Sequence, residues 1–411
     1  MDTTSVAQTE KITYLENGSI TSVQGFEASG IHCGLKRKRK DLALVYSKLP
    51  LTYAGTFTTN KAKAAPVIIN QDILRKGKKV RALIINSAYA NACTGIDGHL
   101  DAVEIQNKTA TALKVAPTEV LVSSTGVIGE RIPVKKITSS LNTLIEKLNP
   151  NGGLDAAQAI MTTDLIKKHF ALEVQLSKGK VTIGGIAKGS GMIHPNMATM
   201  LSFVTTDAKI NNTVLQKALT ESVNDSFNKI SVDGETSTND MVLVLANGAS
   251  DIVIEENSND YNLFTKALKS INIKMAKSIV ADGEGATKLI TINITNAPSE
   301  KDANLIAEAL ATSPLVKTAM NGNDPNWGRI ISAASSSGAD ISPNKVALYF
   351  GNLQILKPGY ITDFNEQDAV NILKEKEISI TLDLSSGTAN TTWWTCDYSE
   401  QYIKINSQYR T

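Results

Sequence analysis

Several features that would indicate familiar classes of protein are missing from this sequence. The three cysteines, Cys33, Cys93 and Cys396, lie far apart and form no CxxC pair, so the sequence predicts neither a disulfide framework nor a zinc site. The four histidines form no HExxH motif, which argues against a metal hydrolase. No GxSxG elbow and no GxGxxG after a strand occur, which excludes the usual serine hydrolases and dinucleotide-binding enzymes.

Long apolar runs and a strong net charge are also absent. No stretch approaches the roughly 18 consecutive apolar residues of a membrane-spanning helix. The amino-terminal MDTTSVAQTEKITYLENG lacks the basic start and apolar core of a secretory signal, so we expect a cytoplasmic protein with no membrane partner. The net charge of only +2 creates no general field that would attract nucleic acid.

The size and composition are those of a globular protein. The chain has 411 residues, more than a single hydrophobic core usually serves, and 42% of them are hydrophobic. We expect two domains: a catalytic domain over residues 1–288 and a smaller α+β domain over residues 289–411.

The most distinctive stretch is KGSGMIHPNMATML, residues 188–201. Its glycines, proline and asparagine tolerate or impose unusual backbone angles, so it predicts a contorted loop that delivers Thr199 to the start of the strand MLSFVTT. A threonine hydroxyl needs a neighbouring base to act as a nucleophile. Cutting the Ala198–Thr199 bond would free an α-amine, whose pKa of about 7.7–8.0 suits that role. The alternative is an ordinary connection between two strands, with Thr199 as a β-branched strand residue.

The same fourteen residues resemble the self-cleavage motif of the arginine-biosynthesis ornithine acetyltransferases, also called glutamate N-acetyltransferases. Further matches run from about Gly25 to Thr411 and include FTTN and NSAYANACTG, although Ala88 and Tyr89 stand where that family usually has Gly and Asn. The resemblance implies an α+β fold, namely a helix/sheet/sheet/helix sandwich of the self-processing N-terminal-nucleophile type with a smaller C-terminal α+β domain.

The resemblance also implies an activity. Thr199, freed by self-cleavage after Ala198, would carry acetyl from N2-acetyl-L-ornithine to L-glutamate without a metal or organic cofactor. Some members of the family also accept acetyl-CoA as donor, and no residue of this sequence decides that point. The two products of cleavage would assemble as a heterotetramer of two alpha and two beta chains.

Other site residues are assigned by the same resemblance. Thr125 and Gly126, in the strand end SSTG, match the family's oxyanion-hole pair, although the residues alone would also allow an ordinary turn. A carboxylate suits the ammonium groups of an amino-acid substrate, and a lysine charge would help keep the Thr199 amine neutral. The matching substrate-binding positions are Thr162, Lys188, Thr199, Glu284, Asn406 and Thr411. Leu165 follows the TTD sequence where the family often has Thr.

Other interpretations stay open at this point. A related self-cleaving aminopeptidase or amidase would share the Thr199 chemistry but release acyl groups to water. The basic run KRKRK, residues 36–40, could bind nucleic acid or phosphate, but an apolar strand follows it directly and a solvated hairpin tip is favoured. The cluster Ser237 to Asp240 could bind a cation, although capping or loop hydrogen bonding is favoured. His194 lies near Thr199, but a loop role is favoured over that of a base.

The hydrophobic periodicity predicts several helices and a β-hairpin, FALEVQL-SKGK-VTIGGIAKG, whose second strand leads into the nucleophile loop. The alternation of apolar and polar residues over Tyr402 to Asn406 predicts a final strand. The expected helices cover Asp101 to Leu113, Val134 to Leu148, Leu154 to Asp164, Val214 to Ile230, Tyr261 to Val280, Ala303 to Leu310 and Asp368 to Glu375.

Overall fold

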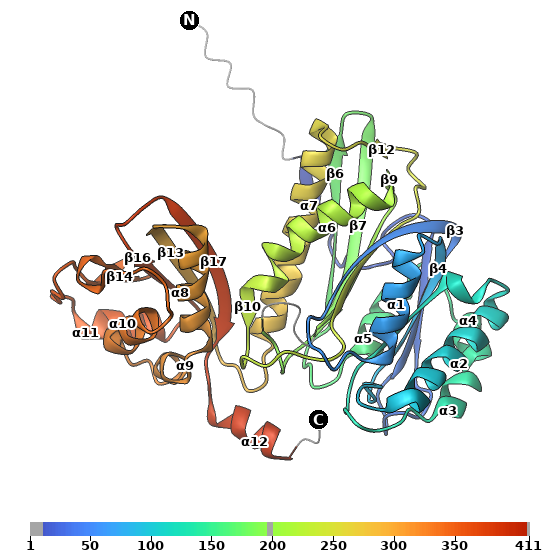
Figure 1. Cartoon of the computed structure of the whole chain (residues 1–411), viewed down its shortest axis with the longest axis horizontal. Coiled ribbons are helices and arrows are strands. Elements are labelled where there is room, and N and C mark those ends of the chain that lie inside the picture. The colour runs from blue at the N-terminus through green and yellow to red at the C-terminus, as the bar shows by residue number, and fades with distance from the viewer. Residues whose placement is uncertain (1–10, 195–199, 409–411) are drawn as a thin grey trace, which may run out of the picture.

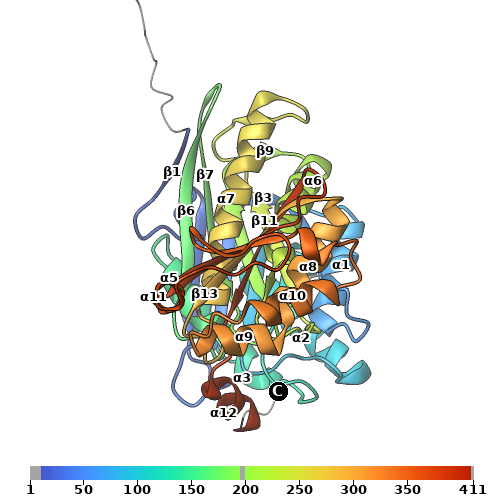
Figure 2. The ribbon, with the colours of Figure 1, turned by 90° about the vertical axis from the view of Figure 1, so that its left-hand side faces the viewer.

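The structure is a computed structural model that describes residues 11–194 and 200–408 (Figure 1). Ala198, Thr199 and Thr411 therefore lie outside the described residues. Helices and sheets are both abundant, and the predicted α+β class is confirmed. The C-terminal elements, orange to red in Figure 1, lie to one side of the larger part of the chain, and Figure 2 views the molecule from that side.

A sheet of nine strands forms the frame of the larger part. Its order is β1-β6-β7-β8-β11-β3-β4-β5, and β2 pairs with β3. The strands are β1 (Ile12–Tyr14), β2 (Phe26–Ile31), β3 (Leu42–Phe57), β4 (Val80–Asn86), β5 (Val120–Ser124), β6 (Lys168–Leu176), β7 (Gly179–Lys188), β8 (Leu201–Thr206) and β11 (Met241–Ala246). The predicted hairpin corresponds to β6 and β7.

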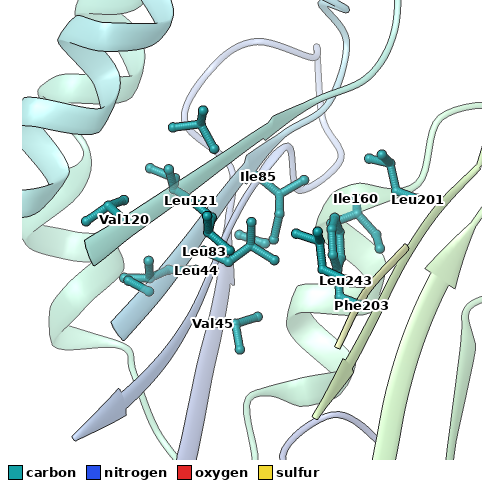
Figure 3. Packing of buried hydrophobic residues seen from close by; sticks show 14 of the residues in the cluster. Leu44, Val45, Leu83, Ile85, Val120, Leu121, Ile160, Leu201, Phe203 and Leu243 are labelled. Atoms are coloured by element: carbon teal, nitrogen blue, oxygen red, sulfur yellow. The ribbon is translucent and has the colours of Figure 1, made fainter. Parts of the chain in front are cut away.

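The long strand β3 belongs to both halves of this sheet. Its residues 42–46 pair with β2 and β4, whereas its residues 52–57 pair with β11. The two halves face each other across one core, in which Ile85 of β4 lies opposite Phe203 and Leu243, with Ile160 beside them (Figure 3). The two halves therefore form two layers of sheet that pack against each other.

Helices cover the outer faces of these layers. The helices α6 (Asn212–Asn224) and α7 (Asn259–Ala281) pack on the half that contains β6, β7 and β11, where they share a core with Val242 and Val244. The neighbouring residues of β11 point the other way, into the core between the sheets, as alternation along a strand requires. The other half contacts α1 (Ala65–Arg75), α2 (Gly95–Leu113), α3 (Val134–Thr138) and α4 (Leu141–Glu146), while α5 (Gly153–Ile160) contacts both halves. This is the predicted helix/sheet/sheet/helix order.

The C-terminal elements have a core of their own, formed by residues from Ile290 to Trp393. A sheet of six strands has the order β10-β17-β13-β16-β14-β15. The division of the chain into residues 1–288 and 289–411 stays a prediction. The C-terminal elements are β13 (Leu289–Ala297), α8 (Glu300–Thr312), α9 (Pro314–Asn321), α10 (Trp327–Ser335), β14 (Ala347–Phe350), β15 (Leu353–Leu356), α11 (Glu366–Leu373), β16 (Glu377–Asp383) and β17 (Ala389–Cys396). The strand β10 (Ile230–Ser231) comes from earlier in the chain and joins this sheet beside β17. A separate pair of strands, β9 (Lys209–Ile210) and β12 (Val253–Ile254), lies in the larger part.

The expected helices exist, but none has the expected bounds, and four differ clearly. The helix α2 begins at Gly95, six residues before the expected Asp101. The helix expected over Val134 to Leu148 is divided into α3 and α4, α5 ends at Ile160, and α6 ends at Asn224 before a short 3-10 turn.

One secondary-structure prediction is wrong. The tail expected to be extended over Tyr402 to Asn406 is the helix α12 (Glu400–Gln408). No described strand pairs with it, Ile403 is 70% exposed, and the side chain of Asn406 donates to the carbonyl oxygen of Tyr402 one turn earlier. Because alternation stabilises a strand only when a sheet can accept it, local helix formation prevails here.

Candidate active site

A pocket of about 250 Å³ lies where β5, β7 and α12 come close together. It contains every predicted site residue that falls within the described part of the chain. These residues come from segments far apart in the sequence: Thr125, Gly126, Thr162, Lys188, Glu284 and Asn406.

Thr125 and Gly126 follow directly after β5. The backbone N–H of Thr125 donates to the carbonyl oxygen of Asn86 at 3.1 Å, which fixes this turn against the end of β4. Gly126 has φ +135°, and a Cβ at this position would lie 2.1 Å from the carbonyl carbon of Ala88. Ala88 itself has φ 87°, a region that side chains disfavour. The turn therefore requires glycine at 126 and holds Ala88 in a strained conformation.

Lys188 is the buried last residue of β7. Its Nζ donates to Thr125 Oγ1 at 3.4 Å, a contact that leaves the hydroxyl proton of Thr125 available for another acceptor. Burial lowers the pKa of Lys188, and the charge of Asp164 opposes that shift. Lys188 pairs with Leu201, the first residue of β8, so the segment that follows Thr199 begins beside this lysine.

Glu284 and Asn406 form the opposite side of the pocket. Asn406 Nδ2 donates to Glu284 Oε2 at 2.9 Å, which attaches α12 to the pocket. The backbone N–H of Glu284 donates to Ser190 O at 2.7 Å. A Cβ at Gly191 would lie 2.4 Å from Glu284 Oε2, so glycine is required for this close approach.

Two carboxylates at the pocket are not among the predicted catalytic or substrate-binding residues: Asp233, which is partly buried and lines the pocket, and Asp240, which is buried. Asp233 accepts from the N–H groups of Met192 and Ile193 and from the hydroxyl of Tyr402 at 3.3 Å, and burial raises its pKa. Asp240 Oδ1 accepts from Met200 N–H at 2.9 Å, and burial raises its pKa well above the ordinary value. Asp240 Oδ2 has no hydrogen-bond partner among the described residues.

The polar cluster Ser237 to Asp240 serves loop hydrogen bonding, as expected. Asn239 Nδ2 donates to Ala90 O at 2.5 Å and to Ser124 O at 2.8 Å, so the cluster supports the end of β5. A run of polar residues before a buried strand was the signal in the sequence, but its contact with β5 depends on the tertiary fold.

The remaining candidate motifs lie in other places. The KRKRK run connects β2 and β3, and its middle residues are exposed, which agrees with the expected hairpin tip. His194 Nε2 lies 3.2 Å from Glu308 Oε1 on α8. Within residues 11–194 and 200–408, no group of three or more His, Cys, Asp and Glu side chains is arranged to hold a metal ion. The helices in the same ranges include none that is long and apolar enough to cross a membrane.

Comparison with known proteins assigns a family. The sequence model of the ArgJ family matches residues 27–411. The arginine biosynthesis bifunctional protein ArgJ of Thermotoga neapolitana is 47% identical over 394 residues, which cover 94% of this chain and 99% of that protein. The protein of the same name from Oceanobacillus iheyensis is 45% identical over 412 residues and covers 100% of both chains.

A solved structure, ornithine acetyltransferase complexed with ornithine from Mycobacterium tuberculosis, is 38% identical and covers 45% of this chain and 98% of that chain, with a TM-score of 0.42. The curated relatives place this chain among the enzymes of arginine biosynthesis. It belongs to the ArgJ family. The family resemblance seen in its sequence is thereby confirmed.

Proposed function

We propose that this chain transfers the acetyl group of N2-acetyl-L-ornithine to L-glutamate, with Thr199 as the nucleophile. The observation that supports this most strongly is the pocket, in which an oxyanion-hole candidate, a buried lysine and a carboxylate from distant segments line one small cavity. Such a set can hold a small amino-acid derivative by its charged groups and stabilise a tetrahedral intermediate at its acyl carbon.

Maturation comes first. The Oγ of Thr199 attacks the carbonyl carbon of Ala198, and water hydrolyses the resulting ester, which leaves a free α-amine on Thr199. Two chains result, residues 1–198 and 199–411, and we propose that they remain together as a heterotetramer of two alpha and two beta chains in the cytoplasm. The division into domains 1–288 and 289–411 belongs to the same proposal.

Transfer then takes place in two steps. The hydroxyl of Thr199 gives its proton to its own amine, its Oγ attacks the acetyl carbon, and ornithine leaves with the proton on its nitrogen. The amine of glutamate next attacks the acetyl ester, so that N-acetylglutamate leaves and Oγ regains a proton. Thr125 Oγ1–H and the backbone N–H of Gly126 donate to the oxyanion in both steps.

Recognition of the substrate follows from the charges in the pocket. The carboxylate of Glu284 binds an ammonium group of the amino acid, and the Lys188 charge binds a carboxylate or keeps the neighbouring Thr199 amine neutral. Thr162, Asn406 and Thr411 supply hydroxyl and amide groups for the remaining polar atoms.

The decisive experiment is one incubation of purified enzyme with acetylornithine and glutamate. We expect N-acetylglutamate and ornithine in equal amounts. Double-reciprocal plots of the initial rate at several concentrations of both substrates should give parallel lines, because a covalent acetyl-enzyme forms. Acetate without N-acetylglutamate would instead identify a hydrolase of the aminopeptidase or amidase type. A parallel incubation with acetyl-CoA and glutamate decides whether that donor is also accepted.

A further inference from the structure

Lys168, the first residue of β6, is a buried lysine that no step of the proposed reaction uses. Its Nζ donates to Asp164 Oδ1 at 2.8 Å and to Asp282 Oδ2 at 2.6 Å. The side chains of Lys168, Asp164 and Asp282 are 0%, 0% and 3% exposed. Charges this deeply buried are costly unless they are paired, so the three side chains form one tightly coupled unit.

The carboxylate of Asp164 also holds two segments of the pocket wall. It accepts from the backbone N–H of Thr162 at 2.8 Å and from that of Gly189 at 2.7 Å. Thr162 lines the pocket itself, and Gly189 directly follows Lys188. Burial alone would raise the pKa of Asp164, but the charges of Lys168 and Lys188 outweigh it and hold that pKa well below its usual range. The carboxylate is therefore ionised whenever the enzyme is folded at ordinary pH.

The carboxylate of Asp282 holds the rest of the same loop. It accepts from the N–H of Leu165 at 3.0 Å and from that of Ile166 at 3.3 Å. The side chain of Leu165 is 81% exposed, so the departure from the family sequence at this position faces outward while its backbone is fixed. Asp282 precedes the pocket residue Glu284 by two positions, and therefore its anchoring also fixes the segment that carries that glutamate.

Two further contacts join the same segments. Ser190 O accepts from the N–H of Glu284 at 2.7 Å, and the hydroxyls of Ser190 and Thr163 share a hydrogen bond of 2.6 Å. The loop 162–166, the end of β7 and the residues after α7 are thus one connected frame. Lys168 is the cation at its centre, although it does not line the pocket.

We propose that Lys168 is a positioning residue, which acts through Asp164 and Asp282 to hold the substrate-binding segments at the spacing that the amino acid requires. This inference rests on the proposed function of the pocket. It concerns binding, because the frame carries Thr162, Lys188 and Glu284 rather than the proposed nucleophile.

The test compares Lys168→Met and Asp282→Asn with the matched control Lys288→Met. Lys288 is also buried, and its Nζ donates to three acceptors, Met320 O, Asn323 Oδ1 and Leu373 O, none of which lines the pocket. The measurements are the Kd for L-ornithine by calorimetry, the KM values and kcat of acetyl transfer, and the melting temperature, all on self-cleaved protein.

We expect Lys168→Met to weaken ornithine binding and lower kcat/KM by roughly 10–100-fold, mainly through KM, because a shift of about 1 Å in a binding segment has that effect. Lys288→Met should lower the melting temperature and leave the Kd unchanged. A double mutant with Thr162→Val should lose less than the sum of the two single losses, since both changes act on one segment.

If Lys168→Met does not fold, Asp282→Asn decides, because its amide has the same shape and still offers an acceptor to Lys168. A folded variant at either position whose Kd and KM stay within about twofold of the wild type would overturn the inference, since a positioning shift costs far more. Wild-type enzyme that neither binds ornithine nor transfers acetyl would overturn the proposed function instead.

Discussion

Buried lysines are used differently in the two parts of this molecule. Around the pocket, Lys168 lies between two carboxylates. Where the larger part meets the C-terminal part, Lys288 donates to carbonyl oxygens at the ends of α9 and α11. Within the C-terminal part, Lys317 donates to Thr395 Oγ1 at 2.7 Å and to Cys396 O. Burial lowers the pKa of both Lys288 and Lys317.

The acceptors of each lysine indicate what that lysine stabilises. Lys288 satisfies carbonyl groups that helix ends leave unpaired, and Lys317 satisfies acceptors at the end of β17, so both stabilise the packing of a core. A lysine between two carboxylates, each of which also accepts from backbone N–H groups, fixes loops to one another in a single geometry. We therefore expect changes near the pocket to alter kinetics, and changes in the core of the C-terminal part to alter stability.

The largest effect should come from Thr199→Ala, which removes the proposed nucleophile. Both self-cleavage and acetyl transfer should be lost, because one hydroxyl serves both attacks. Intact-mass measurement should then show only the 44.0 kDa precursor. The exposed Thr388→Ala in the C-terminal part is the control and should cleave and transfer normally. Transfer by the Thr199 variant at the wild-type rate would refute the nucleophile.

The next largest effect should come from Thr125→Val, which keeps the shape of the side chain and removes its hydroxyl. Acetyl transfer should slow by roughly 10²–10³ if the hydroxyl donates to the oxyanion. The matched variant Thr125→Ser keeps a hydroxyl and should retain most of the activity. A loss of less than about threefold in the folded Val variant would remove Thr125 from that role, because oxyanion donors contribute far more.

A smaller effect should follow from removal of residues 409–411. The helix α12 leads to this terminus, and Asn406 on the helix already contacts Glu284 in the pocket. We expect a higher KM for acetylornithine or glutamate, while self-cleavage, which needs no substrate, proceeds. Both KM values unchanged in a truncated enzyme that cleaves normally would show that the terminus does not contact substrate.

The smallest effect concerns Asp240, a buried carboxyl beside the pocket. Burial raises its pKa well above 3.8, and the hydrogen bond from Met200 N–H and the charge of Lys188 only partly oppose this. A raised folded-state pKa contributes stability that is present below the unfolded pKa and is lost as the pH rises. The side chain of the Asp240→Asn variant cannot ionise. As the pH rises from about 4 to 8, the melting temperature of this variant should therefore fall less than that of the wild type. Parallel melting curves across that range would contradict the shifted pKa.

The sequence predicts the local features of the site better than its contacts. The glycines at 126 and 191 indicate a turn or loop in the sequence. They do not indicate which residues come close, and only the assembled fold shows that Ala88 and Glu284 approach these positions. The contact of Lys188 with Thr125 joins residues 63 positions apart and follows from the pairing of the strands, not from either motif.

Asp233 and Asp240 could not be selected from the sequence for a similar reason. Each lies in a polar loop whose composition suits hydrogen bonding in general, and their hydrogen-bond donors come from other segments. The helix α12 differs from the predicted strand because an alternation of apolar and polar residues over so short a segment is ambiguous when no sheet edge is available.

The order of strands in the large sheet has a consequence for maturation. The strands β8 and β11, which follow residue 199, lie between β7 and β3, which precede it. Six register pairs join β8 to β7, and six join β11 to β3. A cut after Ala198 would therefore yield two chains with interleaved strands. They could separate only if the pairing of β7 with β8 and that of β3 with β11 were both broken. Lys188 and Leu201 pair across the first of these contacts, so the two chains stay joined close to the proposed cut.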